Sequence, residues 1–272
     1  MLTRSPIRAI DSRQNPRLKE LRRAFAAPGS HPRGLVGIEG PNLVEEALRA
    51  RLVLSSLFLA RGSESFLDSL ALPAGVEILS VPRELLAAAL ATETPQPVAA
   101  LVAPPAWTWN DLLQNGEKIL VLAGLQDPGN LGAILRSAEA FGASGIVSLP
   151  GTVSPWNPKA VRASAGSVFR LPCVSASPQE AFRKLRAAGL RIWTTALSNA
   201  TPAASAPLHE PFALLIGNEG NGVPPALAAQ AGAALTIPCP GPVESLNAAV
   251  AAGILLYEAS RQRASHCREA AQ

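Results

Sequence analysis

Short apolar runs alternate with segments of helical periodicity through the first hundred residues of the chain. Apolar runs bounded by turn residues predict strands, and apolar positions spaced three and four apart predict helices. We expect strands at 34–40, 54–60, 76–81 and 97–103, and helices at 15–26, 41–52 and 83–91. Strands that alternate with helices in this way are typical of an α/β sandwich.

The stretch 104–117 breaks this alternation. It holds two adjacent prolines, several polar residues and an Asn-Gly pair, which are features of a linker or a domain boundary. We therefore expect two domains, a smaller α/β domain at 1–106 and a second domain at 107–272.

The second domain repeats the alternation of strands and helices. Strands are expected at 118–125, 145–150, 169–174, 191–197, 212–217 and 234–239, and helices at 130–141, 158–166, 178–188, 224–231 and 245–264. This order predicts a mostly parallel sheet with helices on both faces. Ligands of such sheets bind beyond the carboxyl ends of the strands, so the informative residues should directly follow the strands.

The helix expected at 130–141 begins in a glycine-containing loop and carries one arginine away from its apolar side. Its apolar stripe is Leu131, Ile134, Leu135 and Ala138. Asn130 stands where an N-cap is expected. Arg136 lies about 200° around the helix from Ile134. We therefore expect Arg136 to be exposed, and its role is the first question that the sequence raises.

The composition is that of a globular protein. Of the 272 residues, 48% are hydrophobic and 16% are charged, and no apolar run has the length of a membrane span. The N-terminus has no apolar core of a secretory signal, so we expect none. Cysteines and histidines are few and scattered, at Cys173, Cys239, Cys267, His31, His209 and His266. We therefore expect no disulfide, no metal site and a cytoplasmic location.

Positive charge is concentrated at the start of the chain. The net charge is +4 and the pI is about 9.3, and residues 1–33 carry eight arginines and lysines against two acidic residues. A basic segment of this kind suits a polyanion such as RNA, with Arg13 and Arg17 as candidate contacts. A solvated helix face or a frayed end explains the same charge equally well at this point.

Three loops rich in glycine, proline and asparagine follow three of the expected strands, at 126–130, 218–224 and 240–247. Each has a plain structural reading, because glycines are common in turns and a serine such as Ser245 is common at a helix start. The loop at 218–224 lacks the Lys-Ser/Thr of a phosphate-binding P-loop, and Glu219 would repel a phosphate there. We expect its backbone to approach a neutral or cationic ligand.

Among the polar residues of these loops and of the helix after the first of them, we single out one arginine (Arg136), one glutamate (Glu219), one serine (Ser245) and two asparagines (Asn130 and Asn247). The loops and this helix contain no His, Cys or Lys nucleophile, which disfavours acyl transfer by a catalytic triad and hydrolysis by a metal. The set suits a transfer in which a cofactor carries the reactive group and the protein positions it.

Three segments resemble the ordered motifs of the SpoU/TrmH family in the SPOUT superfamily. They are DPGNLGAILRSAEAFGA from Asp127, LLIGNEGNGVP from Leu214, and IPCPGPVESLNAAVAAGILLYEASRQR from Ile237. The segment KAVRASAGSVFRLP (159–172) resembles the stretch between the first two motifs, and LVGIEGPNLVEEAL is similar to the family's N-terminal substrate-binding domain. Members of this family are S-adenosylmethionine-dependent RNA ribose 2′-O-methyltransferases.

This resemblance implies an α/β fold whose C-terminal part, from about Ile216, is threaded into a trefoil knot. It also implies a homodimer with the active site near the subunit interface. The motif positions that carry catalytic roles are Asn130, Arg136, Glu219, Ser245 and Asn247. The positions that would hold S-adenosylmethionine, largely through backbone, are Thr195, Ala196, Leu197, Gly217, Asn218, Ile237, Pro238 and Leu246.

The resemblance gives Arg136 a role at the target nucleotide. A guanidinium stays protonated in proteins, so we favour an electrostatic role over that of a general base. Arg136 would bind a phosphate bidentately and stabilise the developing alkoxide. Arg162 is a further candidate for RNA contact, with a salt bridge as the alternative.

Two other functions compete with this interpretation. A non-catalytic RNA-binding protein on the same fold would show damaged motifs, whereas all five catalytic positions are intact. A nucleotide-dependent dehydrogenase needs a GxGxxG fingerprint, which the chain lacks. An N-terminal substrate domain of this size favours ribosomal RNA as the substrate, with transfer RNA as the alternative.

Overall fold

The computed structural model of the chain describes residues 5–26, 33–90, 92–114, 116–242 and 245–269. Arg4 of the basic segment, His31 and the last residue of the helix expected at 83–91 lie outside these residues. The chain forms two compact units: unit 1 contains residues 1–106 and 156–170, and unit 2 contains residues 107–155 and 171–272.

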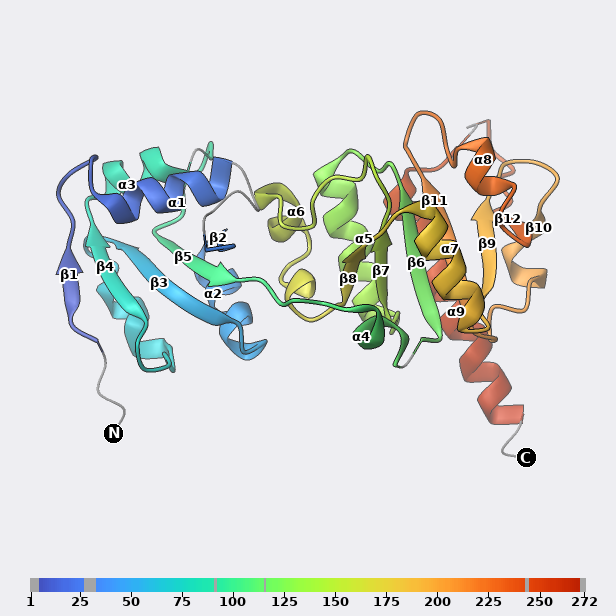
Figure 1. Cartoon of the computed structure of the whole chain (residues 1–272), viewed down its shortest axis with the longest axis horizontal. Helices are drawn as coiled ribbons and strands as arrows, with labels where there is room; N and C mark the ends of the chain where they lie inside the picture. The colour runs from blue at the N-terminus through green and yellow to red at the C-terminus, as the bar shows by residue number, and fades with distance from the viewer. Residues whose placement is uncertain (1–4, 27–32, 91, 115, 243–244, 270–272) are drawn as a thin grey trace. The chain divides into compact units, whose positions relative to one another are not determined.

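Unit 1 is built on a mixed five-stranded sheet in the order β1-β4-β3-β5-β2 (Figure 1). The strands are β1 (Ile7–Ala9), β2 (Val36–Glu39), β3 (Val53–Ala60), β4 (Glu77–Val81) and β5 (Val98–Ala103). The helices are α1 (Pro16–Ala26), α2 (Pro41–Arg49), α3 (Arg83–Leu90) and α6 (Pro158–Ala163). The predicted strands and helices of this part are confirmed. The sequence did not predict β1, because all three of its residues are exposed at the sheet edge.

Residues 156–170 pack with unit 1, whereas the sequence placed them in the second domain. Two ion pairs account for this. Arg162 Nη1 lies 3.5 Å from Oε2 of the buried Glu39, and Arg170 Nη1 lies 2.6 Å from Glu46 Oε2. The α6 helix also contacts β2.

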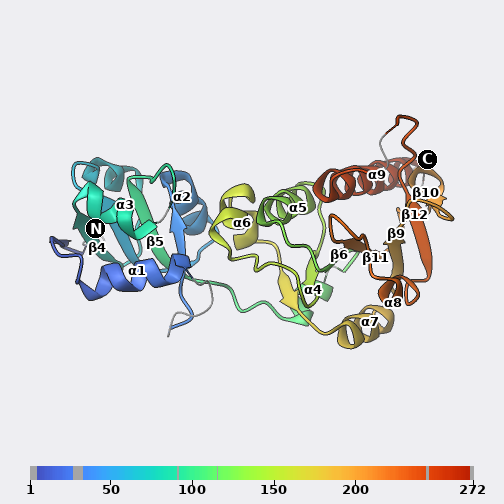
Figure 2. The same cartoon turned by 90° about the horizontal axis from the view of Figure 1, so that it is seen from above.

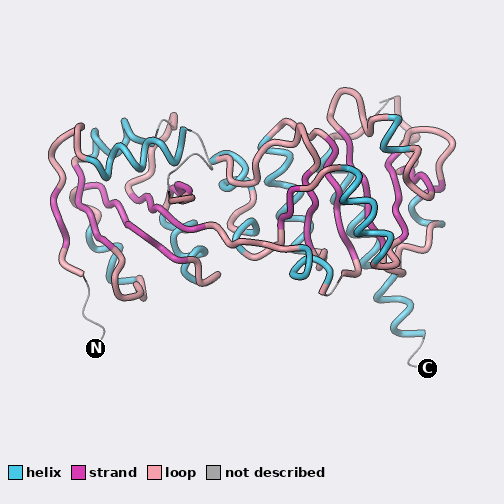
Figure 3. The backbone as a smooth tube through the Cα atoms, viewed as in Figure 1, coloured by secondary structure: helices cyan, strands magenta, loops and turns pink. Residues whose placement is uncertain are grey.

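Unit 2 is built on a seven-stranded sheet in the order β10-β12-β9-β11-β6-β7-β8, and its strand pairs are all parallel. The strands are β6 (Lys118–Ala123), β7 (Gly145–Ser148), β8 (Cys173–Ser175), β9 (Arg191–Thr195), β10 (Thr201–Pro202), β11 (Phe212–Gly217) and β12 (Ala233–Thr236). The prediction of an α/β fold with a mostly parallel sheet is confirmed. The loops that follow β6, β11 and β12 therefore leave the sheet at one end (Figure 3).

Helices cover both faces of this sheet. They are α4 (Trp109–Leu113), α5 (Pro128–Ala140), α7 (Pro178–Ala187), α8 (Pro225–Ala228) and α9 (Ala248–Glu269). Figure 2 shows α5 and α9 side by side on one face and α7 on the other, and α5 contacts α9. Buried side chains of β6 and β11 form the centre of the core between these layers.

Two local predictions were wrong and one was incomplete. The stretch 104–117, expected to be a linker or a domain boundary, contains the division between the two units after Ala106, but it also contains α4, which begins at a capping box formed by Thr108 and Asp111. The strand expected at 169–174 begins at Cys173, because Ser167–Phe169 form a 3-10 turn. The helix expected from Ser245 begins at Ala248. Among the described residues, no helix has the length and apolar character that crossing a bilayer requires.

Candidate active site

The first motif forms the loop between β6 and α5, and its N-cap is Asp127. The Asp127 carboxylate accepts a hydrogen bond of 2.7 Å from the backbone N–H of Asn130. Pro128 occupies the first turn, where its missing N–H costs nothing. The prediction of Asn130 as the cap was wrong, because the helix starts two residues earlier. The side chain of Asn130 is therefore available for other contacts.

Asn130 connects the three motifs through its side-chain amide. Its Nδ2 donates to Glu219 Oε1 at 2.9 Å, and its Oδ1 accepts from Asn247 Nδ2 at 2.9 Å. The backbone N–H of Asp127 also donates to Glu219 Oε1, at 3.4 Å. Parallel pairing of β6 with β11 places the first two motifs next to each other. The structure thus brings together three of the five predicted catalytic residues.

The Glu219 carboxylate is held in its ionised form. Loss of solvent around it would by itself raise its pKa, but hydrogen bonds from the Asn130 side chain and from backbone N–H groups outweigh that effect. The pKa of Glu219 is therefore lowered. A fixed negative charge at this end of the sheet suits a cationic ligand.

Asn247 has two tasks in this arrangement. Its Oδ1 accepts from the backbone N–H groups of Ala249 and Val250, at 2.9 and 3.3 Å, and so caps the start of α9. Its Nδ2 holds Asn130. The sequence gave a helix cap as the structural alternative for Ser245, and the structure shows that Asn247 caps the helix.

The second motif is a tight loop closed by Asn218. Asn218 Nδ2 donates to the carbonyl of Gly124 at 3.0 Å, and its Oδ1 accepts from the backbone of Gly220 at 2.8 Å. Asn218 and Gly222 also exchange backbone hydrogen bonds of 3.0 and 2.9 Å. The loop is thereby fixed against the end of β6.

Glycine is required at position 217 because the loop folds back onto it. A Cβ on Gly217 would lie 2.0 Å from the carbonyl carbon of Gly222. Gly217→Ala should therefore force the backbone apart and lower the free energy of unfolding by about 1–3 kcal/mol. Thermal unfolding measures this effect. Gly241→Ala is the matched control, because its Cβ would meet nothing within 4 Å. Equal melting temperatures for the two variants would contradict the packing described here.

The predicted cofactor segments meet at the same end of the sheet. Thr195 Oγ1 donates to the carbonyl of Leu215 at 3.3 Å, and the backbone N–H of Ala196 donates to Leu235 at 2.9 Å. Leu197 is 74% exposed although it is apolar. Backbone groups, an exposed aliphatic side chain and an ionised carboxylate suit an adenine ring and a sulfonium, so the residues present fit S-adenosylmethionine.

Asn130, Glu219 and Asn247 form a hydrogen-bond network to which Arg136 and Ser245 do not belong. Arg136 is exposed on α5, as expected, and forms no ion pair within the described part of the chain. It lies six residues after Asn130, about 9 Å further along the helix axis. Ser245 is exposed, and its side chain makes no hydrogen bond to another described residue. The structure does not bring either residue into contact with the other three.

An apolar groove of about 470 Å³ runs between α5 and α9. Its lining residues are Ala133, Ser137, Phe141, Ala249, Val250, Gly253, Ile254 and Tyr257. Three of the apolar side chains are exposed: Val250 by 51%, Ile254 by 39% and Tyr257 by 56%. Arg136 lies three residues after the lining residue Ala133, so the two are neighbours on the surface of α5.

Of the three residues predicted to contact RNA, two form ion pairs within unit 1 and the third is exposed. Arg17 forms ion pairs with Glu20 and Glu77, and Arg162 pairs with Glu39, which is the alternative that the sequence left open. Arg13 is exposed in the turn before α1.

Sequence reasoning missed two residues that shape the site. Asp127 caps α5, and its Asp-Pro-Gly context was a usable signal. Thr152 was not considered, although its hydroxyl donates to the carbonyl of Leu122 at 2.9 Å and accepts from Gly124 at 3.1 Å. It thereby fixes the loop after β7 to the end of β6.

The described residues offer neither a metal site nor a reactive thiolate at Cys173. They contain no group of three or more His, Cys, Asp or Glu that could hold a metal ion. Burial raises the pKa of the Cys173 thiol to about 12, so this thiol stays protonated.

Two family descriptions match the chain. Residues 117–257 match the SpoU rRNA Methylase family, and residues 38–108 match the description "RNA 2'-O ribose methyltransferase substrate binding". Among relatives, the 23S rRNA (guanosine(2553)-2'-O)-methyltransferase RlmP of Bacillus subtilis is 34% identical over 92% of this chain and 98% of its own length.

Solved structures agree with the sequence matches. The AdoMet-bound rRNA methyltransferase from Sinorhizobium meliloti is 32% identical, with a TM-score of 0.80 over 94% of this chain and 98% of its own. The SpoU methyltransferase AviRb from Streptomyces viridochromogenes, in complex with AdoMet, is 28% identical, with a TM-score of 0.82 over 93% and 99% of the two chains.

Proposed function

The chain belongs to the SpoU rRNA methylase family, and we propose that it methylates a ribose 2′-hydroxyl of ribosomal RNA. It is an RNA methyltransferase that uses S-adenosylmethionine. The observation that carries the choice of RNA is the match to RlmP, which spans both units of the chain. In this proposal unit 1 binds RNA and unit 2 carries out methyl transfer, in the cytoplasm where ribosomal RNA is found.

The cofactor supplies a methyl group that a sulfonium already activates for attack. Thr195, Ala196 and Leu197 would hold it together with Gly217, Asn218, Ile237, Pro238 and Leu246, where three strands end. The ionised Glu219 contributes a negative charge at the same end of the sheet.

The three-residue network would position the ribose. Glu219 fixes the Asn130 amide in one orientation, and Asn130 fixes the Asn247 amide. Each amide nitrogen carries a second hydrogen that these bonds do not use. Those two hydrogens can donate to oxygens of the target nucleotide. Holding the hydroxyl near the methyl group in this way contributes several kcal/mol to catalysis, on the order of the gain from orientation in general.

Arg136 would stabilise negative charge at the target nucleotide. Its exposed guanidinium, without an ion pair in the described residues, is free to bind a phosphate beside the target ribose. It would stabilise the alkoxide as the hydroxyl proton leaves for that phosphate or for water. Ser245 would contact the ribose from the third motif.

The proposal includes a homodimer through unit 2 and a trefoil knot in its C-terminal part. The apolar groove between α5 and α9 supports the dimer, because three exposed apolar side chains on one helix suit a second copy of the same surface. Arg136 is a neighbour of the groove residue Ala133 on α5, so the active site would lie near the interface. The knot follows from the family and stays a prediction.

The dimer is tested by a charge placed in the groove. Ile254→Arg should give a monomer, because the guanidinium would be buried without a partner at the interface. Light scattering after size-exclusion chromatography measures the mass. Val53→Arg, at a side chain that is 70% exposed in unit 1, is the matched control and should leave the dimer intact. A monomeric wild-type protein, or a dimeric Ile254→Arg variant, would contradict the proposal.

The choice of RNA is tested by methyl transfer from radiolabelled S-adenosylmethionine. Unmodified 16S, 23S and transfer RNA transcripts are supplied in separate reactions. Label in a ribosomal transcript alone is the expected result. Label in transfer RNA alone would replace ribosomal RNA with transfer RNA as the substrate.

A further inference from the structure

Helix α1 separates its charged residues onto two sides. At 100° per residue, Lys19, Arg22 and Arg23 lie within about 100° of arc. Arg17 and Glu20 lie about 160° and 100° around the helix from Lys19, and both are half-buried. Leu18, Leu21, Ala24 and Phe25 bury the remaining side in the core of unit 1.

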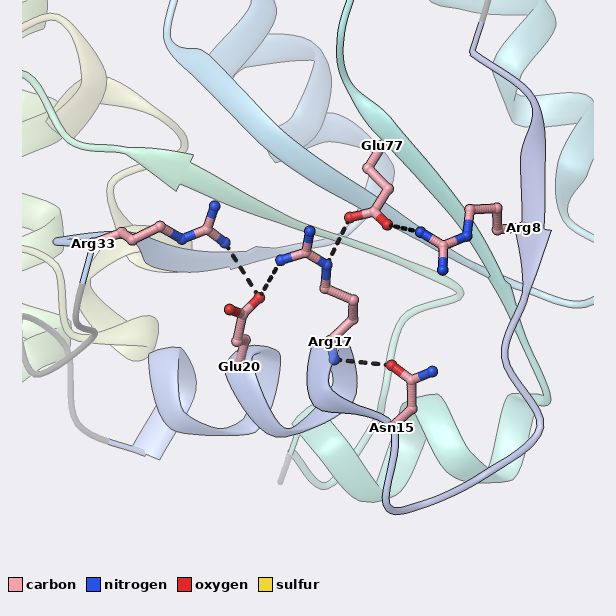
Figure 4. Close-up of polar contacts among 6 residues, drawn as sticks. All are labelled: Arg8, Asn15, Arg17, Glu20, Arg33 and Glu77. Atoms are coloured by element: carbon pink, nitrogen blue, oxygen red, sulfur yellow. Dashed lines mark hydrogen bonds and ion pairs between the residues drawn. The ribbon is translucent and has the colours of Figure 1, made fainter.

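The charges of Arg17 and Glu20 are neutralised inside unit 1 (Figure 4). Arg17 Nε lies 2.7 Å from Glu77 Oε2, and Arg17 Nη1 lies 2.8 Å from Glu20 Oε2. Glu77 also receives Arg8 at 2.6 Å, and Glu20 receives Arg33 at 3.2 Å. These residues hold α1 against β4, so Arg17 is engaged in the fold.

The other charged residues of α1 have no such partners in the described part of the chain. Lys19, Arg22 and Arg23 are exposed, and none of them forms an ion pair or a side-chain hydrogen bond with another described residue. Asp11, Glu20 and Glu77 are already paired, since Asp11 lies 2.7 Å from Arg61 and the two glutamates bind Arg17. We call Lys19, Arg22 and Arg23 the α1 cation face. These three cations, which have no partner among the described residues, form a local positive patch on a fixed helix.

We propose that the α1 cation face binds phosphates of the RNA substrate. This proposal rests on the proposed function. The patch has the charge and spacing of a phosphate-backbone contact, because side chains three and four apart on a helix are neighbours. The apolar side chain within its arc is that of Ala26, whose methyl group offers little surface for a protein partner to bury. The helix ends before residue 38, where the match to the substrate-binding description begins.

Contacts between cationic side chains and phosphates make RNA binding depend on salt concentration. Each one releases condensed counterions, so the logarithm of the binding constant falls more steeply with the logarithm of salt concentration. Removing one contact lowers that slope by about 1. The contacts do not read bases, so their loss should weaken binding to different ribosomal RNA sequences equally.

The test removes the three charges and keeps the helix. The triple variant Lys19→Gln, Arg22→Gln, Arg23→Gln retains good helix formers and leaves the buried side unchanged. Its matched control, Arg183→Gln, Lys184→Gln, Arg268→Gln, removes three positive charges from α7 and α9 of unit 2. Binding of each full-length protein to unmodified 16S and 23S transcripts is measured between 50 and 300 mM salt, roughly the range where slopes are linear.

We expect the triple variant to bind about tenfold or more weakly at low salt, with a slope reduced by about 2 to 3. Its KM for RNA should rise, while kcat at saturating RNA and the affinity for S-adenosylmethionine stay at wild-type values. The control should keep the wild-type slope. Equal slopes for both variants and the wild type, with wild-type methylation intact, would overturn the α1 cation face alone. A wild-type protein that neither binds nor methylates these transcripts would overturn the proposed function as well.

Discussion

Arg136→Ala should lose methyl transfer by about 10²–10³-fold in kcat, the loss expected when a group that stabilises developing charge is removed. The side chain makes no ion pair within the described residues and is exposed on α5. Its loss should therefore leave the melting temperature and the affinity for S-adenosylmethionine unchanged. Single-turnover transfer to the substrate RNA measures the effect on chemistry.

Two further variants sharpen this result. Arg136→Lys keeps the charge but loses the bidentate geometry, so its rate should fall between those of wild type and Arg136→Ala. Arg183→Ala removes another exposed cation of unit 2 and should keep the wild-type rate. A rate for Arg136→Ala within a factor of about two of wild type would remove Arg136 from the catalytic account.

Glu219→Ala should lower kcat/KM by about 10²-fold, because the amides that position the ribose lose their anchor. The Nδ2 of Asn130 and the backbone N–H of Asp127 would both lose their acceptor. Glu219→Gln keeps the shape and one carboxamide oxygen as an acceptor, so it should retain more activity than Glu219→Ala. The comparison separates loss of hydrogen bonds from loss of charge. Equal activity of Glu219→Ala and wild type would contradict the role of the network.

The lowered pKa of Glu219 gives this network a pH dependence with a definite sign. A carboxyl whose pKa is lower in the folded protein than in the unfolded chain stabilises the fold above the unfolded pKa. That stabilisation is lost as the pH falls through the folded pKa. Protonation of Glu219 in the folded protein would also weaken its hydrogen bonds from Asn130 and Asp127. The wild-type protein should therefore lose activity as the pH falls through this lowered pKa, whereas Glu219→Gln should show no such loss from this group. Transfer rates measured from neutral to acidic pH test the difference.

The pattern of apolar positions predicted the parallel sheet of unit 2, because β11 and all of β6 after Lys118 are apolar runs, and both strands are buried along their full length. It missed β1, because a strand of three exposed residues with Arg8 between two apolar ones is too short to show as an apolar run. It also missed α4, because proline and polar residues around 104–117 conceal a capping box that begins one turn of helix. The spacing of apolar residues along the chain therefore predicts buried strands well and short capped helices poorly.

The location of the site could be predicted from the sequence, but the contacts between its residues could not. The three motif loops could be placed at one end of the sheet, because parallel strands end together. The bonds from Asn130 to Glu219 and Asn247 could not be predicted, since they join residues 89 and 117 positions apart. The pairing of Arg17 with Glu77 was hidden for the same reason, because β4 lies sixty residues from α1 in sequence. Sequence charge therefore identified a basic segment without telling which of its arginines are free.

The position of the methyl group on the product tests the central claim most directly. A ribosomal RNA transcript labelled by the wild-type protein with radioactive S-adenosylmethionine is hydrolysed in alkali and separated by size. Methylation of a ribose 2′-oxygen removes the internal nucleophile that alkali uses to cleave the next phosphodiester bond. The account predicts that the label is recovered in alkali-resistant dinucleotides. Label in mononucleotides would show methylation of a base, and a protein that binds S-adenosylmethionine but labels no ribosomal transcript would contradict the proposed substrate.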